Sequence, residues 1–155
     1  KLMEQGDKKP TEQSLAENIE TPKQKVVFVD DYLDNSELAW MEFKMDNPQL
    51  ASRFEAEYIA RAQNLADAVE KILKTSPDII FMDNDLGAEF GNADGPEVAR
   101  ALREAGFAGS MVGNSSSGSK PFEKKGVAGM MNGFLPDKSK GIKEVLEKLL
   151  SEPRG

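Results

Sequence analysis

Acidic side chains directly follow two short apolar runs in this sequence. Asp30 and Asp31 come after residues 26–29, and Asp83 comes after residues 79–82. Two ionised carboxylates about 5 Å apart repel each other by roughly 3 kcal/mol at an effective dielectric constant of about 20, so three that meet require a cation or a proton among them. Carboxylate oxygens suit a hard divalent cation, and Mg²⁺ is the one that we expect.

The two apolar runs predict buried strands. They are rich in branched and aromatic side chains and show no polar alternation, which is typical of strands covered on both faces of a parallel sheet. Weaker patterns predict three more strands, around residues 58–60, 110–112 and 134–135.

Apolar residues recur at helical spacing between these strands. Leu38, Met41 and Met45 form the stripe that predicts the first helix. Further helices are predicted over residues 65–73, 96–105 and 142–150, with a weaker one ending near residues 127–128. Strands that alternate with helices predict an α/β fold, a doubly wound five-stranded parallel sheet flanked by helices.

In such a sheet, ligands bind at the carboxyl ends of the strands, where successive connections turn in opposite directions. If the first and third strands are neighbours, Asp30, Asp31 and Asp83 converge at that edge. The fourth strand delivers the hydroxyls of Ser115 and Ser116 to the same edge. The sequence therefore predicts one shallow acidic cleft.

Composition narrows the classes of function. The 155 residues contain no His and no Cys, which excludes a Ser-His-Asp triad, the usual zinc sites and disulfides. A net charge of −7 argues against nucleic-acid binding. We expect a cytoplasmic chain without a membrane span, with a polar tail over residues 1–24 before a single domain over residues 25–152. Because the sequence begins with Lys1 and not with Met, a fragment of a longer regulator or of a hybrid kinase is one expectation, and a stand-alone domain is the other.

Several segments together resemble a known family. They are FVDD at residues 28–31, PDIIFMDNDLG at 77–87, DGPEVARALREAG at 94–106, the VGNSS segment at 112–116 and FLPDKS at 134–139. In this order and spacing, the sequence resembles the receiver domain of bacterial two-component response regulators, the CheY-like superfamily with its flavodoxin-like fold.

The resemblance implies a phosphoacceptor site. It gives Asp30 and Asp31 as Mg²⁺ ligands, Asp83 as both a ligand and the phosphorylated carboxylate, and the backbone carbonyl of Asp85 as a further ligand. It also implies a histidine kinase or a histidine phosphotransfer protein as phosphodonor, and a homodimer or an effector protein as the output partner. Such a domain is not an enzyme beyond its own phosphoryl transfer and dephosphorylation.

The resemblance also implies a switch. Lys138 corresponds to the family's lysine, which supplies positive charge as the acyl phosphate forms, and Ser115 corresponds to its switch hydroxyl. The spacing from Ser115 to Lys138 is one residue longer than in the family, and Ser116 as the switch hydroxyl would restore it. Phe134 is the candidate switch aromatic, although it lies one place further from Lys138 than in the family. Ser139 stands where the family has proline after the lysine, which puts the expected cis peptide in doubt.

Two other readings remain open. The IIFMDNDLG segment also resembles the first motif of haloacid dehalogenase-type phosphatases, with Asp83 as nucleophile and Asp85 as acid/base. Too few residues follow Asp83 for the remaining motifs of that family, and Leu86 replaces its usual threonine or valine. The other reading is a pseudo-receiver that keeps the fold as an interaction module, since the loop between Asp83 and Gly95 is atypical.

Overall fold

The computed structural model describes residues 22–152, whose strands form one sheet of five parallel strands. The strands are β1 (Gln24–Val29), β2 (Phe54–Ile59), β3 (Ile79–Asp83), β4 (Ser110–Asn114) and β5 (Gly133–Phe134), in the order β2-β1-β3-β4-β5. This arrangement confirms the predicted doubly wound fold. Most of the tail predicted over residues 1–24 lies outside the described residues.

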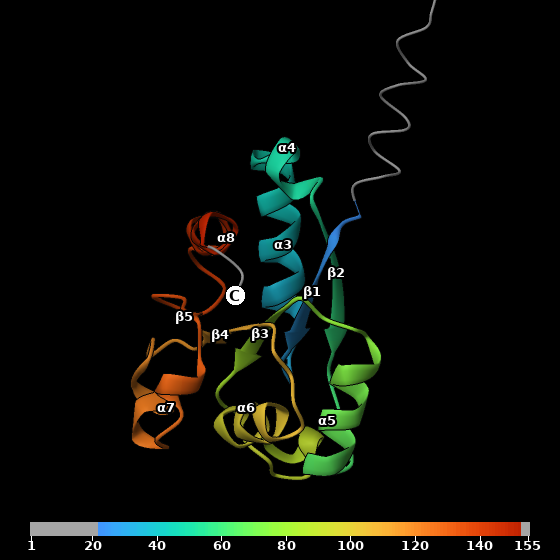
Figure 1. Ribbon diagram of the computed structural model, residues 1–155, viewed down its shortest axis with the longest axis vertical. Coiled ribbons are helices and arrows are strands. Elements are labelled where there is room, and N and C mark those ends of the chain that lie inside the picture. Colours follow the sequence, from blue (N-terminus) through green and yellow to red (C-terminus); the bar gives the residue numbers. More distant parts are fainter. Residues whose placement is uncertain (1–21, 153–155) are drawn as a thin grey trace, which may run out of the picture.

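Helices cover both faces of the sheet (Figure 1). One face carries α3 (Asp34–Asp46), α4 (Pro48–Ala51) and α8 (Ile142–Ser151). The other carries α5 (Leu65–Lys74), α6 (Gly95–Glu104) and the short α7 (Lys120–Lys124). Two 3-10 turns, η1 (Gly87–Phe90) and η2 (Ala128–Met130), complete the connections.

Two apolar clusters lie on either side of the sheet. On the α3 and α8 side, Phe28 and Phe81 stack with ring centroids 5.0 Å apart, and Trp40 packs edge-on against Phe28. On the α5 and α6 side, the fully buried Phe90 and Phe122 belong to the second cluster. The central strands are thus covered on both faces, as their continuous apolar runs predicted.

The strand register brings the carboxyl ends of three strands to one level. Val29 of β1 pairs with Met82 of β3, and Asp83 pairs with Asn114 of β4. Asp30 follows Val29 directly, so Asp30, Asp83 and Asn114 form a row across the sheet edge. This is also the edge at which the connections leave β1 in opposite directions, because β2 and β3 lie on its two sides.

The prediction for the first helix is wrong about its buried face. Leu38, Met41 and Met45 are exposed, Met45 by 74%, whereas Trp40 and Phe43 pack against the sheet. The helix carries apolar side chains all round, and the large aromatic ones take the inner face because they bury the most area.

Three other predicted boundaries shift. β2 begins at Phe54, earlier than the predicted residues 58–60, and β5 spans Gly133–Phe134. The fourth helix, α7, ends at Lys124, and Val127 lies in the turn before η2. Within residues 22–152, no helix has the length and apolar character needed to cross a bilayer.

Candidate functional site

Three carboxylates meet at the carboxyl edge of the sheet. One oxygen from each of Asp30, Asp31 and Asp83 lies within 4.8 Å of the other two. Asp30 and Asp83 are almost fully buried, with exposed fractions of 0% and 4%, while Asp31 is half-buried. The structure thus brings these three predicted residues together.

Asp30 is tied to the start of α3. Its Oδ1 accepts a hydrogen bond of 3.0 Å from the Tyr32 backbone N–H, and its Oδ2 accepts one of 3.4 Å from the buried Ser36 hydroxyl. These two hydrogen bonds hold the Asp30 carboxylate in place. They also offset part of the cost of burying a polar group away from water.

Lys138 bridges two of the carboxylates. Its Nζ lies 3.2 Å from Oδ2 of Asp30 and 3.3 Å from Oδ2 of Asp83. Burial alone lowers the pKa of Lys138, but the attraction of Asp83 and Asp30 outweighs it and leaves this pKa above its usual value. The ammonium therefore remains charged beside Asp83, where the resemblance predicted it.

Two of the clustered carboxyls have pKa values above their usual range. Burial, followed by repulsion from Asp30, raises the pKa of Asp83 to about 7, although Lys138 works in the opposite direction. Burial and Asp30 also raise the pKa of Asp31. The raised pKa values mean that ionising these carboxyls together is unfavourable. A cation among their oxygens would therefore stabilise the ionised cluster.

Gly95, at the end of the loop that follows β3, packs against the backbone of Asp83. The Gly95 N–H donates to the Asn84 carbonyl over 2.8 Å, and a methyl group at Gly95 would overlap the Asp83 carbonyl oxygen. Gly95 opens α6, which Asp94 and Glu97 cap by reciprocal side-chain to backbone hydrogen bonds. The start of α6 thus packs directly on the backbone of Asp83.

The other predicted site residues lie around this cluster. Asp85 is exposed in the loop after Asp83, and its carboxylate is not one of the clustered groups. Ser115 is buried, and its Oγ accepts a 3.1 Å hydrogen bond from the Ser117 N–H within its own turn. Ser116 is exposed. Phe134 is half-buried beside Phe122, with ring centroids 5.6 Å apart.

Asn114 is a site residue that the sequence reasoning missed. It is 1% exposed and pairs with Asp83 in the sheet. Its Oδ1 accepts a 2.7 Å hydrogen bond from the Ser139 N–H, and its Nδ2 has no partner among the described residues. A proline in place of Ser139 would lack this N–H, and the Lys138–Ser139 peptide is trans. The sequence signal for this contact was Ser139, which stands where the family has proline.

Comparisons with solved structures agree with this architecture. A two-component response regulator of the LuxR family from Aurantimonas sp. SI85-9A1 is 20% identical, with a TM-score of 0.63 over 85% of this chain and 88% of that one. The receiver domain of NtrX from Brucella abortus is 19% identical, with a TM-score of 0.60 over 83% of this chain and 99% of that one. Chemotaxis protein CheY4 from Vibrio cholerae is 20% identical, with a TM-score of 0.57 over 82% of this chain and 98% of that one.

The comparisons establish the fold. No protein-family model matches the sequence, and curated protein sequences give no match. The five-stranded parallel sheet and these solved structures together show that this chain has the CheY-like, flavodoxin-like fold that the sequence resemblance predicted.

Proposed function

We propose that this chain is the receiver domain of a two-component phosphorelay, in which Asp83 accepts a phosphoryl group from a phosphohistidine of a histidine kinase or phosphotransfer protein. The observation that carries the proposal is the position of Asp83 at the switch point of the sheet, within 3.3 Å of Lys138 and beside Asp30 and Asp31. A nucleophile, a cation-binding group and a fixed positive charge are the parts that phosphoryl transfer needs.

The donor set fits Mg²⁺. Carboxylates of Asp30, Asp31 and Asp83 would hold the ion, with the backbone carbonyl of Asp85 as a fourth protein ligand, and each of these groups offers the oxygen donor that Mg²⁺ prefers. When bound at these residues, Mg²⁺ would offset the negative charge on the oxygens of the transferring phosphoryl group.

The chain's own residues perform the remaining steps. A carboxylate oxygen of Asp83 attacks phosphorus and forms a new O–P bond, while the N–P bond of phosphohistidine breaks and its electron pair returns to the imidazole nitrogen. Lys138 offers its ammonium to the new negative charge. The reaction moves one phosphoryl group and needs no further reactant.

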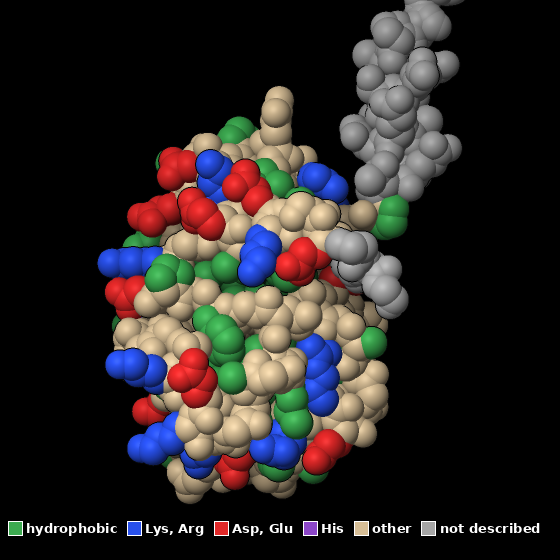
Figure 2. All heavy atoms as spheres, turned by 60° about the vertical axis from the view of Figure 1, so that its left-hand side comes forward, with side chains coloured by type: hydrophobic (Ala, Val, Ile, Leu, Met, Phe, Trp, Pro, Cys, Tyr) green, Lys and Arg blue, Asp and Glu red, His purple; other side chains and the backbone are tan. Residues whose placement is uncertain are grey.

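Phosphorylation of Asp83 changes the shape of a surface that binds other proteins. An acyl phosphate adds negative charge and acceptor oxygens, which the Ser115 or Ser116 hydroxyl can bind as Phe134 repacks. Phe134 borders a groove of about 400 Å³ between β5 and α8, which Val145 and Leu149 also line. In Figure 2, which brings this side of the molecule forward, apolar side chains lie in a band between charged ones. An effector or a second copy would bind there.

Residues 25–152 form the receiver domain, which works in the cytoplasm, while most of the segment predicted as a tail lies outside the described residues. The chain's net charge of −7 favours protein partners over nucleic acid. The domain catalyses only its own phosphorylation and dephosphorylation.

Incubation with acetyl phosphate and Mg²⁺ tests the function. Intact-mass spectrometry should detect one base-labile phosphoryl adduct, which Asp83→Asn abolishes and Asp85→Asn retains. Adduct formation should also stop when EDTA removes Mg²⁺.

Other outcomes would reject the proposal in distinct ways. Continuous release of phosphate at a rate that depends on both Asp83 and Asp85 would identify a phosphatase of the haloacid dehalogenase type. Absence of both adduct and turnover, in a protein that folds and binds Mg²⁺, would identify a pseudo-receiver.

A further inference from the structure

The edge strand β2 presents backbone groups that pair with nothing among residues 22–152. Within these residues, β2 lies at one end of the sheet and pairs only with β1. The Gln24 and Asp30 N–H groups donate to the carbonyls of Arg53 and Ile59, so these odd-numbered residues turn their backbone toward β1. Because backbone groups alternate along a strand, Phe54, Ala56 and Tyr58 turn theirs outward.

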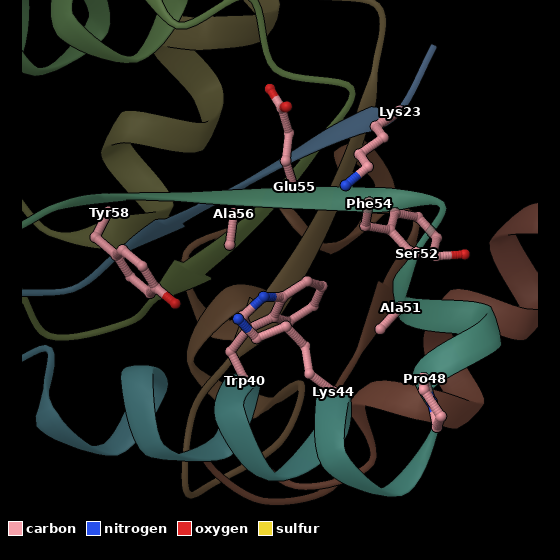
Figure 3. Close-up of a pocket in the computed structure, with 10 residues that line it drawn as sticks. All are labelled: Lys23, Trp40, Lys44, Pro48, Ala51, Ser52, Phe54, Glu55, Ala56 and Tyr58. Atoms are coloured by element: carbon pink, nitrogen blue, oxygen red, sulfur yellow. The ribbon is translucent and has the colours of Figure 1, made fainter. Parts of the chain in front are cut away.

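The same three residues line a groove. Their side chains face α3 and α4 across a hollow of about 460 Å³, which Trp40 also lines (Figure 3). A volume of this size suits the side chains of a bound ligand. An open strand edge beside a groove that can receive alternate side chains is the arrangement by which sheets bind an extended peptide as an additional strand.

Charges on the two faces of β2 differ in sign. Lys23 and Lys44 line the groove and are exposed. Glu55 also borders the groove, but its carboxylate points to the opposite side of the strand in Figure 3, and Glu57 lies on that side too. Lys25 is the cation that pairs with both, at 3.5 Å from Glu55 and 2.7 Å from Glu57, so one negative charge remains there.

The charge pattern disfavours a second copy of β2 as the occupant. In an antiparallel pair centred on Ala56, Glu55 of one copy would face Glu57 of the other, twice over. Like charges directly opposite each other destabilise a strand pair. The net charge of −7 on each chain adds to this repulsion.

We propose that the β2 edge binds an extended segment of a partner protein by strand addition, a function separate from phosphoryl transfer. The segment places apolar side chains and an acidic one in the groove, toward Trp40, Lys23 and Lys44. Its alternate positions carry lysine or arginine toward Glu55 and Glu57. Neither proline nor a bulge interrupts β2, whose register with β1 is continuous from Phe54 to Ile59, so the edge is regular enough to extend.

A designed peptide tests this proposal directly. The probe is a short capped peptide in which lysine alternates with valine, with one aspartate at a valine position. Trp40 is the chain's single tryptophan, and its buried ring lines the groove, so its fluorescence reports occupancy. We expect saturable binding that shifts the Trp40 emission and slows hydrogen exchange at the amides of Ala56 and Tyr58.

Two protein variants and one peptide control separate strand addition from other binding. Ala56→Pro removes an outward N–H without removing a bond to β1, and we expect at least about tenfold weaker binding. Lys44→Glu, at an exposed position, should weaken the aspartate peptide about threefold and favour a peptide with lysine in its place. A peptide with N-methylated main-chain donors should not bind.

Three results would overturn the proposal. One is equal binding of the N-methylated peptide, and another is an unchanged Trp40 emission with unchanged amide exchange in the folded protein. The third is a concentration-dependent dimer in sedimentation that Ala56→Pro abolishes, since a second copy would then occupy the edge. Circular dichroism of both variants confirms that they fold.

Discussion

The Nζ of Lys138 lies 3.3 Å from Oδ2 of Asp83, although the two residues belong to different strand ends on either side of β4. Each residue of the pair is positioned by a separate packing contact. Asp83 sits at the end of β3 under the start of α6, and Lys138 sits in the loop after β5 whose Ser139 N–H is bound by Asn114. The reach of Lys138 to Asp83 therefore depends on the packing of two loops.

Removing the lysine should slow phosphorylation. Lys138→Ala leaves the developing charge on the acyl phosphate without its fixed cation, and we expect the rate with acetyl phosphate to fall about 10²-fold to 10³-fold. Stopped-flow fluorescence or quenched intact-mass analysis measures this rate. Lys140→Ala is the matched control, because Lys140 is exposed and pairs only loosely with Asp137 at 3.9 Å. Equal losses in both variants would contradict the role of Lys138.

The Asp83 carboxyl should make metal-free stability depend on pH. Its pKa is about 7 in the folded protein against 3.8 without the fold, so the folded state keeps a proton that the unfolded state releases. The free energy of unfolding therefore falls as pH rises from about 4 to about 7, by up to about 1.4 kcal/mol per pH unit and about 2 to 4 kcal/mol in total.

Urea unfolding in EDTA measures this loss. Asp83→Asn cannot titrate and should show a flatter profile over the same interval, while the exposed Asp85→Asn should follow the unmodified protein. A profile that is identical in all three proteins would show that Asp83 does not take up the proton.

Magnesium should reverse the instability at neutral pH. An ion that binds only the folded state stabilises it, by about 1.4 kcal/mol when its concentration is tenfold above Kd. We expect Mg²⁺ to raise Tm at about pH 8 in the unmodified protein and in Asp85→Asn, whose backbone carbonyl is intact. Asp31→Asn should lose most of this shift. A shift that persists in Asp31→Asn would place the ion elsewhere.

The sequence predicted the acidic edge better than the surfaces around it. Acidic residues that end buried strands lie close together whenever the strands are parallel neighbours. The strand order alone was therefore enough to predict that Asp30 and Asp83 meet. The first helix failed because its apolar residues occur on every side, and spacing alone does not rank Met41 against Trp40. Asn114 was missed because its partner, the Ser139 N–H, is a backbone group brought to it by the fold.

The glycine beneath Asp83 should be intolerant of a methyl group. Gly95→Ala would drive a carbon into the Asp83 carbonyl oxygen, and we expect a loss of about 2 to 4 kcal/mol in the free energy of unfolding. Gly129→Ala is the control, because nothing lies within 4 Å of the added carbon and its φ is not positive. Chemical denaturation of both proteins checks the difference. Comparable stability would mean that the start of α6 yields without disturbing Asp83.

Asn114 should act on phosphorylation through Lys138. Asn114→Ala leaves the Ser139 N–H without its acceptor, which costs about 1 to 3 kcal/mol of stability and loosens the loop that carries Lys138. We expect the rate with acetyl phosphate to fall about tenfold in this variant. In a Lys138→Ala background the same change should cost no further rate, because the group that it positions is gone. The double-mutant cycle measures this coupling, and additive losses would mean that Asn114 contacts the phosphoryl group itself.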